Sequence, residues 1–268
     1  MNPGASTRSL VIGGRGFVGA AIAQAAREAG WQVTVVGRED YAGQVQERFD
    51  VVINANGNAK RFRANSDPLW DFDSSVRPVY QSLFDFHFSH YVLISSVDVY
   101  NDTSTPATTA EVTPIDLARL PPYGFHKRLA ELCVIRHARS WQIVRLAQMV
   151  SADLKKGPLF DVLNGRPLWV HPTTQLHYMH TRTAGEVIIE LIARAPRNEI
   201  YNVCGRGSVE FSRIVELIGV NGHGAVYADS ERQLYRINTD KTHRHCPLPE
   251  SWSEVCAFVA AAKAAGDA

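Results

Sequence analysis

Three glycines at a spacing of three residues follow the first predicted strand, and this feature limits the fold of the chain more than any other. The apolar run 10–12 ends at Gly13, and Gly16 and Gly19 follow before a segment with helical character. A pyrophosphate can approach a glycine backbone because no Cβ stands in the way, and the next helix offers free N–H groups. A glycine-rich turn without a ligand is the alternative. The strand, turn and helix context predicts a dinucleotide-binding unit.

The rest of the first half predicts an α/β fold. Strand-like runs alternate with helix-like segments up to Leu146, which is typical of a parallel sheet with helices on both faces. We therefore expect a Rossmann-type doubly wound parallel sheet, in which Asp67 caps a helix that begins at Pro68. After Leu146, turn clusters predict a small C-terminal substrate-binding region. The expected division is 1–150 for the dinucleotide-binding portion with the catalytic residues and 151–268 for the substrate-binding region, in one compact domain overall.

Composition excludes several classes of protein. The chain has 28 Lys and Arg against 27 Asp and Glu, a net charge of +1, so no basic field favours nucleic acid or an anionic membrane. No apolar run approaches the ~18 residues of a membrane span, and no apolar signal segment opens the chain. The four cysteines are widely spread, which argues against a disulfide framework or a zinc site. We expect a cytoplasmic enzyme without a metal, a membrane or a nucleic-acid partner.

The end of the second predicted strand bears on the choice between NAD and NADP. NAD-binding proteins place an acidic residue there for the ribose 2′-OH, whereas this chain has Gly37 and Arg38. A guanidinium suits a 2′-phosphate, and Arg15 in the glycine turn can reach the same group. These residues favour NADP(H) over NAD(H). The alternative is that Arg38 is a solvated turn residue and that Glu39 or Asp40 serves the ribose.

A tyrosine and a lysine four residues apart form a candidate catalytic pair. Tyr123 and Lys127 lie in a segment with helical spacing, so their side chains share one face. A phenol titrates near ~10, and a neighbouring ammonium and a bound nicotinamide both lower that pKa. Ser96 follows a strand at the edge of the sheet where ligands bind, and can hydrogen-bond the same substrate oxygen. Alternatively, Ser96 is a turn hydroxyl that caps local backbone.

These motifs occur in the order typical of one family. The glycine motif, the S-x-x-V-Y run from Ser96 to Tyr100 and the Tyr123/Lys127 pair resemble the extended short-chain dehydrogenase/reductase family, of the NAD-dependent epimerase/dehydratase type. Later segments that also resemble it are Val144–Leu146, His177–His180 and Glu199–Val203. The resemblance implies that Ser96 orients the substrate, that Tyr123 is the acid/base and that Lys127 is its electrostatic partner.

Several positions depart from the family's pattern. Gln148 stands where nucleotide-sugar epimerases of the family usually have Asn, and Leu176 replaces an arginine of the region that holds nucleotide-sugar phosphates. Residues 56–58, Asn-Gly-Asn, replace alanines, which implies either a re-routed loop or polar contacts near the nicotinamide. Asp98 stands alone where dehydratases of the family use an Asp-Glu dyad. Its side chain can therefore act either as a base or as a cap of the loop. The sheet half looks complete through Leu146, which places any shortening of the chain in the substrate region.

Together these features predict an NADP(H)-dependent oxidoreductase that transfers hydride between nicotinamide and a secondary alcohol or ketone of a sugar-like metabolite. One alternative is a nucleotide-sugar epimerase or dehydratase with tightly bound NAD(P), and a further one is a non-catalytic NADP-sensing protein of the same fold. The residues expected to bind the cofactor are Gly13, Arg15, Gly16, Phe17, Val18, Gly19, Arg38, Ala55, Asn56 and Lys127. The candidate substrate-binding residues are Asp98, Gln148, Lys155 and His177. The resemblance also implies a homodimer through helices around 67–88 and 123–139.

Overall fold

The computed structural model describes residues 6–58, 60–219 and 231–266. These residues form two compact units, each built from separate stretches of sequence. The first unit contains the described residues up to Asn101, together with Pro114–Leu146 and Arg182–Val203. The second unit contains Asp102–Thr113, Ala147–Thr181 and the described residues from Cys204 onward. Residues 182–203, which the sequence places in the C-terminal region, thus belong to the first unit because their strand joins its sheet.

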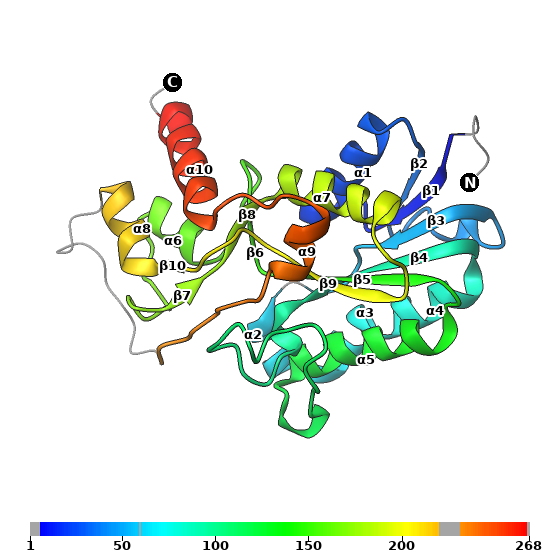
Figure 1. Cartoon of the computed structure of the whole chain (residues 1–268), viewed down its shortest axis with the longest axis horizontal. Coiled ribbons are helices and arrows are strands. Elements are labelled where there is room, and N and C mark those ends of the chain that lie inside the picture. The colour runs from blue at the N-terminus through cyan, green and yellow to red at the C-terminus, as the bar shows by residue number, and fades with distance from the viewer. Residues whose placement is uncertain (1–5, 59, 220–230, 267–268) are drawn as a thin grey trace. The chain divides into compact units, whose positions relative to one another are not determined.

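A six-stranded parallel sheet forms the centre of the first unit (Figure 1), which confirms the predicted Rossmann-type fold. The strand order is β2-β1-β3-β4-β5-β9. The strands are β1 (Arg8–Ile12), β2 (Gln32–Val36), β3 (Arg48–Asn54), β4 (His87–Ser96), β5 (Trp141–Leu146) and β9 (Glu199–Val203). The last seven residues of β4 are all buried, as a central parallel strand covered on both faces requires.

Helices cover both faces of this sheet. Figure 1 shows α1 and α7 on one face and α3, α4 and α5 on the other. The helices of the unit are α1 (Phe17–Glu28), α2 (Arg61–Ser66), α3 (Pro68–Ser75), α4 (Arg77–Asp85), α5 (Pro122–His137) and α7 (Thr181–Arg194), with the short 3-10 turns η1 (Ala42–Gln44), η2 (Val97–Val99) and η3 (Leu117–Arg119). Leu10, Val52 and Ile143 from the strands pack with Val79 and Val134 from α4 and α5 in one buried cluster.

The connection from β2 to β3 is short. Residues 37–47 contain only η1 and no α-helix, so the chain passes directly from the outermost strand to the far side of β1. Doubly wound dinucleotide-binding sheets usually carry two strands beyond the first strand on this side, whereas this sheet carries β2 alone. The expectation of a complete sheet half is therefore wrong. Three of the five side chains of β2 are only partly buried and Gln32 is exposed, because this strand is the sheet edge.

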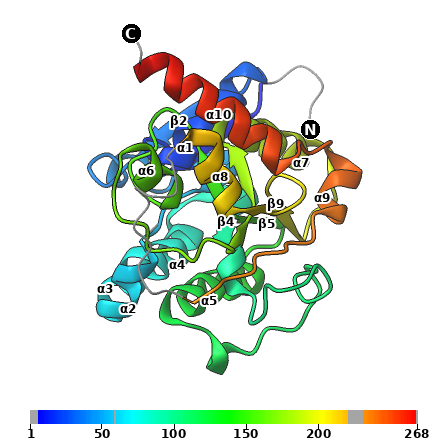
Figure 2. The same ribbon diagram turned by 90° about the vertical axis from the view of Figure 1, so that its left-hand side faces the viewer.

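The second unit is small and mixed. Its strands pair as β6 (Gln148–Val150) with β8 (Tyr178–His180), and as β7 (Gln175–Leu176) with β10 (Val209–Glu210). Its helices are α6 (Pro158–Leu163), α8 (Phe211–Ile218), α9 (Asp240–His245) and α10 (Ser251–Gly266). In Figure 2, α8 lies between α6 and α10. Tyr178, Phe211 and Val255 belong to the apolar core that joins these elements.

Candidate functional site

The glycine turn between β1 and α1 leaves space for a ligand against its backbone. Gly16 precedes the first residue of α1, and its N–H donates to Gly13 O over 2.9 Å. A Cβ on Gly19 would lie 2.2 Å from Gly13 O, so only glycine permits the first turn of α1 to pack this close to the strand end. The first N–H groups of α1 have no partner within the helix and remain available to an anion.

A cavity of about 620 Å³ opens over the carboxyl ends of β1, β2 and β3. This volume lies within the range of small-molecule sites, and the place is the switch point where ligands bind in open α/β sheets. The expected cofactor residues that line it are Gly13, Arg15, Gly16, Arg38, Ala55 and Asn56. Of the other expected cofactor residues, Phe17, Val18 and Gly19 form the first turn of α1. Lys127 lies close to the lining residue Gly57, because a Cβ on that glycine would be 3.1 Å from Lys127 Nζ.

Asp40 forms an ion pair with Arg15, one of the two arginines expected to bind the cofactor. The Gly37 N–H donates to Asp40 Oδ1 over 2.6 Å. The hydrogen bonds from Arg15 and from the Gly37 N–H lower the pKa of Asp40 to about 2. Arg38 is exposed at the cavity and makes no ion pair with a described residue. The 2′-phosphate role expected of Arg15 therefore competes with this ion pair.

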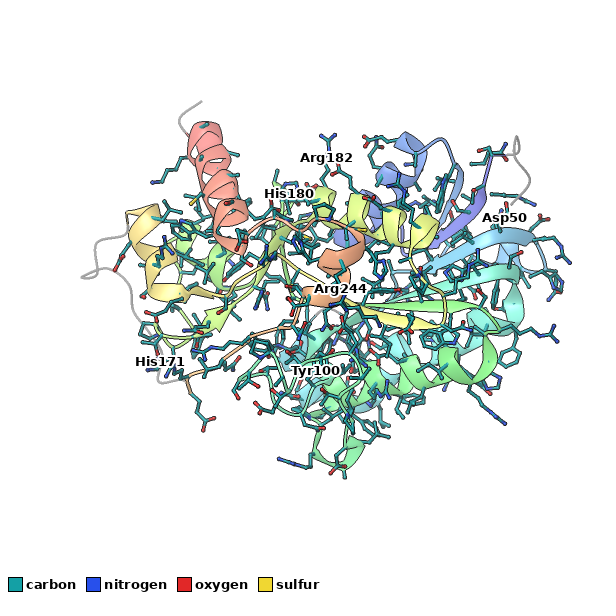
Figure 3. The ribbon with its side chains drawn as sticks, viewed as in Figure 1. Asp50, Tyr100, His171, His180, Arg182 and Arg244 are labelled. Carbon is teal, nitrogen blue, oxygen red and sulfur yellow. The ribbon has the colours of Figure 1, made fainter. Side chains whose placement is uncertain are left out.

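The three expected catalytic residues come from two neighbouring elements of the first unit. Ser96 is the last residue of β4, and Tyr123 and Lys127 lie on α5. Helix α5 packs directly on η2, since a Cβ on Gly124 would lie 2.2 Å from Asp98 O. Figure 3 labels Tyr100 just past the carboxyl end of β4, whereas Asp50 lies near the opposite end of the sheet.

Burial changes the pKa values of both residues on α5. Burial raises the pKa of Tyr123, the Asp98 carboxylate raises it further, and a hydrogen bond with Ser96 lowers it in part. Burial lowers the pKa of Lys127, while the carboxylates of Asp71, Glu131 and Asp98 act in the opposite direction. In the chain alone the Tyr123 phenol is thus harder to ionise than usual, opposite to the direction expected with a bound nicotinamide.

Asp98 contacts the catalytic serine directly. Ser96 Oγ donates to Asp98 Oδ2 over 3.0 Å, and Arg61 Nη1 donates to Asp98 Oδ1 over 2.8 Å. Ser96 Oγ also accepts the Asp98 N–H over 3.2 Å, which is the backbone cap considered from the sequence. Asp98 therefore caps the loop through its backbone and also contacts Ser96 with its side chain. The pairing of Arg61 with Asp98 was not predicted, because nothing in the sequence pairs two residues 37 positions apart.

The Asn-Gly-Asn segment after β3 is held by its neighbours. Asn54 Oδ1 accepts the Asn56 N–H over 3.0 Å, and Ser75 Oγ accepts the Asn58 N–H over 3.0 Å. Ser75 Oγ donates in turn to Asp71 on the same helix, over 3.2 Å. These bonds fix a loop that borders both the cavity and Lys127.

A buried ion pair anchors α5 to the sheet. Glu131 and Arg145 are 0% and 1% exposed, and their two hydrogen bonds measure 2.9 and 2.7 Å. Glu131 also accepts from Ser95 Oγ over 2.6 Å and from Arg128 Nη1 over 2.8 Å. Burial alone favours the neutral acid, but the bonds from Arg145 and Ser95 lower the pKa of Glu131 overall. The pair fixes the helix one turn beyond Lys127.

The remaining candidates lie in the second unit. Gln148 begins β6 and Lys155 is exposed in a turn. His177 is 2% exposed, and its Nδ1 donates to Gly205 O over 2.7 Å while its Nε2 accepts the Ile237 N–H over 3.0 Å. Both ring nitrogens therefore serve the backbone, which is the arrangement of a structural histidine. Its burial lowers the pKa of the ring and so favours this neutral form.

Two features are absent from the described residues. They contain no group of three His, Cys, Asp or Glu side chains placed to hold a metal ion. In the same residues, none of the helices combines the length and the apolar character that crossing a membrane requires.

Comparisons with known proteins agree with the fold and with the motifs. MoeE5, solved in complex with UDP-glucuronic acid and NAD, matches with a TM-score of 0.82 and 13% identity over 97% of this chain and 99% of that chain. A UDP-galactose 4-epimerase matches with a TM-score of 0.77 and 21% identity over 97% and 99%. TunA, an NAD-dependent NDP-hexosamine 5,6-dehydratase of tunicamycin biosynthesis, matches with a TM-score of 0.80 and 17% identity over 96% and 97%.

The sequence comparisons give two further results. Residues 9–204 match the sequence model of the "NAD dependent epimerase/dehydratase family". No curated protein matches the chain.

Proposed function

The chain belongs to the NAD dependent epimerase/dehydratase family, and on this premise we propose that it transfers hydride between a nicotinamide cofactor and a secondary alcohol or ketone carbon of a sugar-like metabolite. The observation that carries the proposal is the convergence of Ser96, Tyr123 and Lys127 at the carboxyl edge of the sheet, beside the cavity of the glycine turn. A non-catalytic NADP-sensing role is less well supported because this set is present in full.

The residues present fit a dinucleotide. The backbone between Gly13 and Gly19 has the close packing and free N–H groups that suit a pyrophosphate. When bound, the nicotinamide supplies the hydride donor or acceptor. Lys127 would hold its ribose, Ser96 Oγ would orient the substrate oxygen, and Tyr123 Oη would move the proton to or from that oxygen.

For the cofactor we keep NADP(H) as the proposal, with Arg38 as the residue for the 2′-phosphate. Arg38 is exposed at the cavity and its guanidinium suits a phosphate. NAD(H) is the second candidate, and the observation in its favour is Asp40, whose fixed carboxylate follows the second strand as the ribose-binding acid of NAD proteins does.

For the net reaction we propose a cycle of the epimerase or dehydratase kind, in which the hydride returns to the substrate. The names of the matching structures, an epimerase and a dehydratase among them, support this choice over the net reduction that the sequence favoured. Net reduction is the second candidate, because Gln148 and Leu176 stand where the resemblance expects residues that hold nucleotide-sugar phosphates.

A panel assay separates these reactions. UDP-glucose, UDP-galactose, UDP-glucuronic acid and simple keto-sugars are each incubated with the protein and NAD⁺ or NADPH. An epimerase gives a product of unchanged mass without net cofactor use, a dehydratase gives a product lighter by one water, and a reductase consumes NADPH in proportion to product. Absence of product and of cofactor turnover with every probe would contradict an enzymatic role on these substrates.

We also propose that the protein is a homodimer through α4 and α5. Tyr80 and Phe84 are 43% and 57% exposed, and their rings lie 5.2 and 5.3 Å from the His137 ring on α5. This exposed aromatic cluster lies on the helices that the resemblance assigns to a dimer interface. The cytoplasmic location remains a prediction.

A further inference from the structure

The cavity of the glycine turn continues past that turn toward the edge of the sheet. Its lining includes Arg38 and Tyr41, on the connection after β2, and Gln81 on α4. In the strand order, β1 with its glycine turn lies between β2 on one side and β3 and β4 on the other, and β4 carries Ser96. A dinucleotide with its pyrophosphate at the turn and its nicotinamide toward Ser96 therefore extends its second nucleoside toward β2.

One carboxylate oxygen joins two side chains of this end of the cavity. Tyr41 Oη and Gln81 Nε2 both donate to Asp85 Oδ2, each over 3.0 Å. Burial raises the pKa of Tyr41, as does its hydrogen bond to Asp85, so the phenol stays protonated at neutral pH and remains a donor. The Tyr41 ring also packs edge-on against Phe86, with ring centroids 5.1 Å apart. Tyr41 and Gln81 thus come from different elements and are held together beside the cavity.

The bond to Asp85 also determines how the Gln81 amide is oriented. A carboxylate only accepts hydrogen bonds, so the amide presents Nε2 to Asp85 and directs its carbonyl Oε1 away from it. Gln81 is exposed at the cavity, so Oε1 and the second hydrogen of Nε2 can meet a ligand there. This pair of groups matches the edge of adenine, whose N6 donates and whose N7 accepts. Hypoxanthine and guanine place a carbonyl oxygen where adenine has N6, so that two acceptors would face each other.

We propose that Tyr41 and Gln81, held by Asp85, form the adenine-binding end of the cofactor cavity, and that Gln81 selects adenine over other purines. The inference deepens the proposed function and rests on it. The Tyr41 ring gives the base an apolar contact that every purine receives equally. The Gln81 amide distinguishes the bases through its hydrogen bonds. Affinity and base selectivity are therefore assigned to different residues, which substitutions can separate.

A fluorescence titration with two matched probes tests the assignment. Wild type and variants are titrated with NADPH or NADH, whichever binds the wild type better, and with its analogue in which hypoxanthine replaces adenine. The wild type should bind the adenine probe about 5- to 150-fold more tightly, the usual discrimination by a bidentate amide. Gln81→Ala should bring the two affinities within about twofold of each other, since that discrimination is lost. Equal affinities in the wild type, or an undiminished preference in Gln81→Ala, would overturn the assignment.

Further variants separate the roles of the three residues. Asp85→Asn should reduce the preference for adenine, because an amide can donate as well as accept and no longer orients Gln81. Tyr41→Ala should weaken the binding of both probes and keep their ratio, whereas Tyr41→Phe retains the ring and should bind both nearly as the wild type does. If Tyr41→Ala changes neither affinity, the ring does not belong to the site.

A matched control and the pattern of failure keep the result specific. Gln24→Ala removes a glutamine that makes the same kind of bond, to Glu28 four residues on, on α1 and outside the cavity lining. It should leave both affinities unchanged. Equal binding of the two probes contradicts the base assignment alone. Absence of binding of both probes contradicts the proposed function and this inference together.

Discussion

Lys127 Nζ lies 6.0 Å from the centre of the Tyr123 ring, one turn further along α5. The two residues share a helix face, as the four-residue spacing predicts. The serine and the aspartate that complete their surroundings come from a strand end and from η2, against which α5 packs at Gly124. The close contact between α5 and η2 therefore brings the acid–base groups together.

Tyr123→Phe should reduce turnover by roughly 100- to 10,000-fold, the usual contribution of a positioned acid or base. The variant loses only the hydroxyl, so affinity for the nicotinamide cofactor should change less than about twofold. Steady-state kinetics on the substrate identified by the panel assay, with a cofactor titration on the same sample, measure both values. An unchanged rate would remove Tyr123 from the chemistry.

Glu131→Gln should destabilise the fold by about 3–5 kcal/mol, because it leaves Arg145 charged and buried without its partner. Urea unfolding followed by circular dichroism measures the change. Glu47→Gln is the matched control, since its ion pair with Arg8 is about half exposed and should contribute ~0–1 kcal/mol. Equal effects of the two substitutions would show that the buried pair does not anchor α5.

Stability should fall as the pH decreases from about 6.5 to about 4, in part because of His90. Burial lowers the pKa of His90 to about 4 in the folded protein, whereas an unfolded histidine titrates near ~6.5. The unfolded state binds the proton first, so the stability contribution is complete above the unfolded pKa and is lost as the pH falls toward the folded one. The loss for this group is about 3 kcal/mol.

Substitution tests the assignment to His90. His90→Gln should flatten the pH dependence of urea unfolding between pH 7 and pH 4.5, while His87→Gln, at an exposed position of the same strand, should not. An identical slope in wild type and His90→Gln would mean that other groups cause the acid loss.

Phe84→Asp should convert the proposed dimer to a monomer. The substitution places a charge in the exposed aromatic cluster of α4 and α5, where burial in an interface would leave it unpaired. Analytical ultracentrifugation at micromolar concentration measures the change. Val112→Asp is the control, at a more exposed apolar position outside these helices. A monomeric wild type would contradict the interface directly.

Features that depend on residues close together in the sequence were predictable. The glycine spacing predicts the turn and helix at α1, and Asp67 caps α3 as expected by accepting the Trp70 N–H over 3.1 Å, with Pro68 in the first turn. Family membership was also predictable, since it rests on motifs in order along the chain. These features depend on neighbouring residues, whose spacing the sequence displays.

Features that depend on tertiary contacts were not predictable. Arg61 reaches Asp98 only because the loop after β3 and the end of β4 meet at one edge of the sheet. His177 is a candidate substrate-binding residue in the sequence, but its ring bonds to two backbone groups that lie 28 and 60 residues away along the chain. The order of the strands in the sheet was not predicted, because strand-like runs do not reveal which of them lie side by side.

The proposed chemistry requires that the glycine-turn cavity binds a nicotinamide dinucleotide, and substitutions of Arg38 and Asp40 test which one it is. Arg38→Ala should weaken NADPH binding about 10- to 100-fold and leave NADH nearly unaffected, since the loss is a charge-assisted contact with the 2′-phosphate. Asp40→Asn should strengthen NADPH binding because it releases Arg15 from its ion pair. If NADH binds more tightly than NADPH and Asp40→Asn weakens the binding of NADH, the cofactor is NAD(H).

The most direct measurement is a fluorescence titration of the wild-type protein with NADPH and with NADH, with ADP-ribose as a competitor for the same site. We predict saturable binding with one cofactor per chain, tighter for NADPH, and displacement by ADP-ribose. Absence of saturable binding of either nucleotide up to millimolar concentration, in protein shown to be folded, would contradict the account.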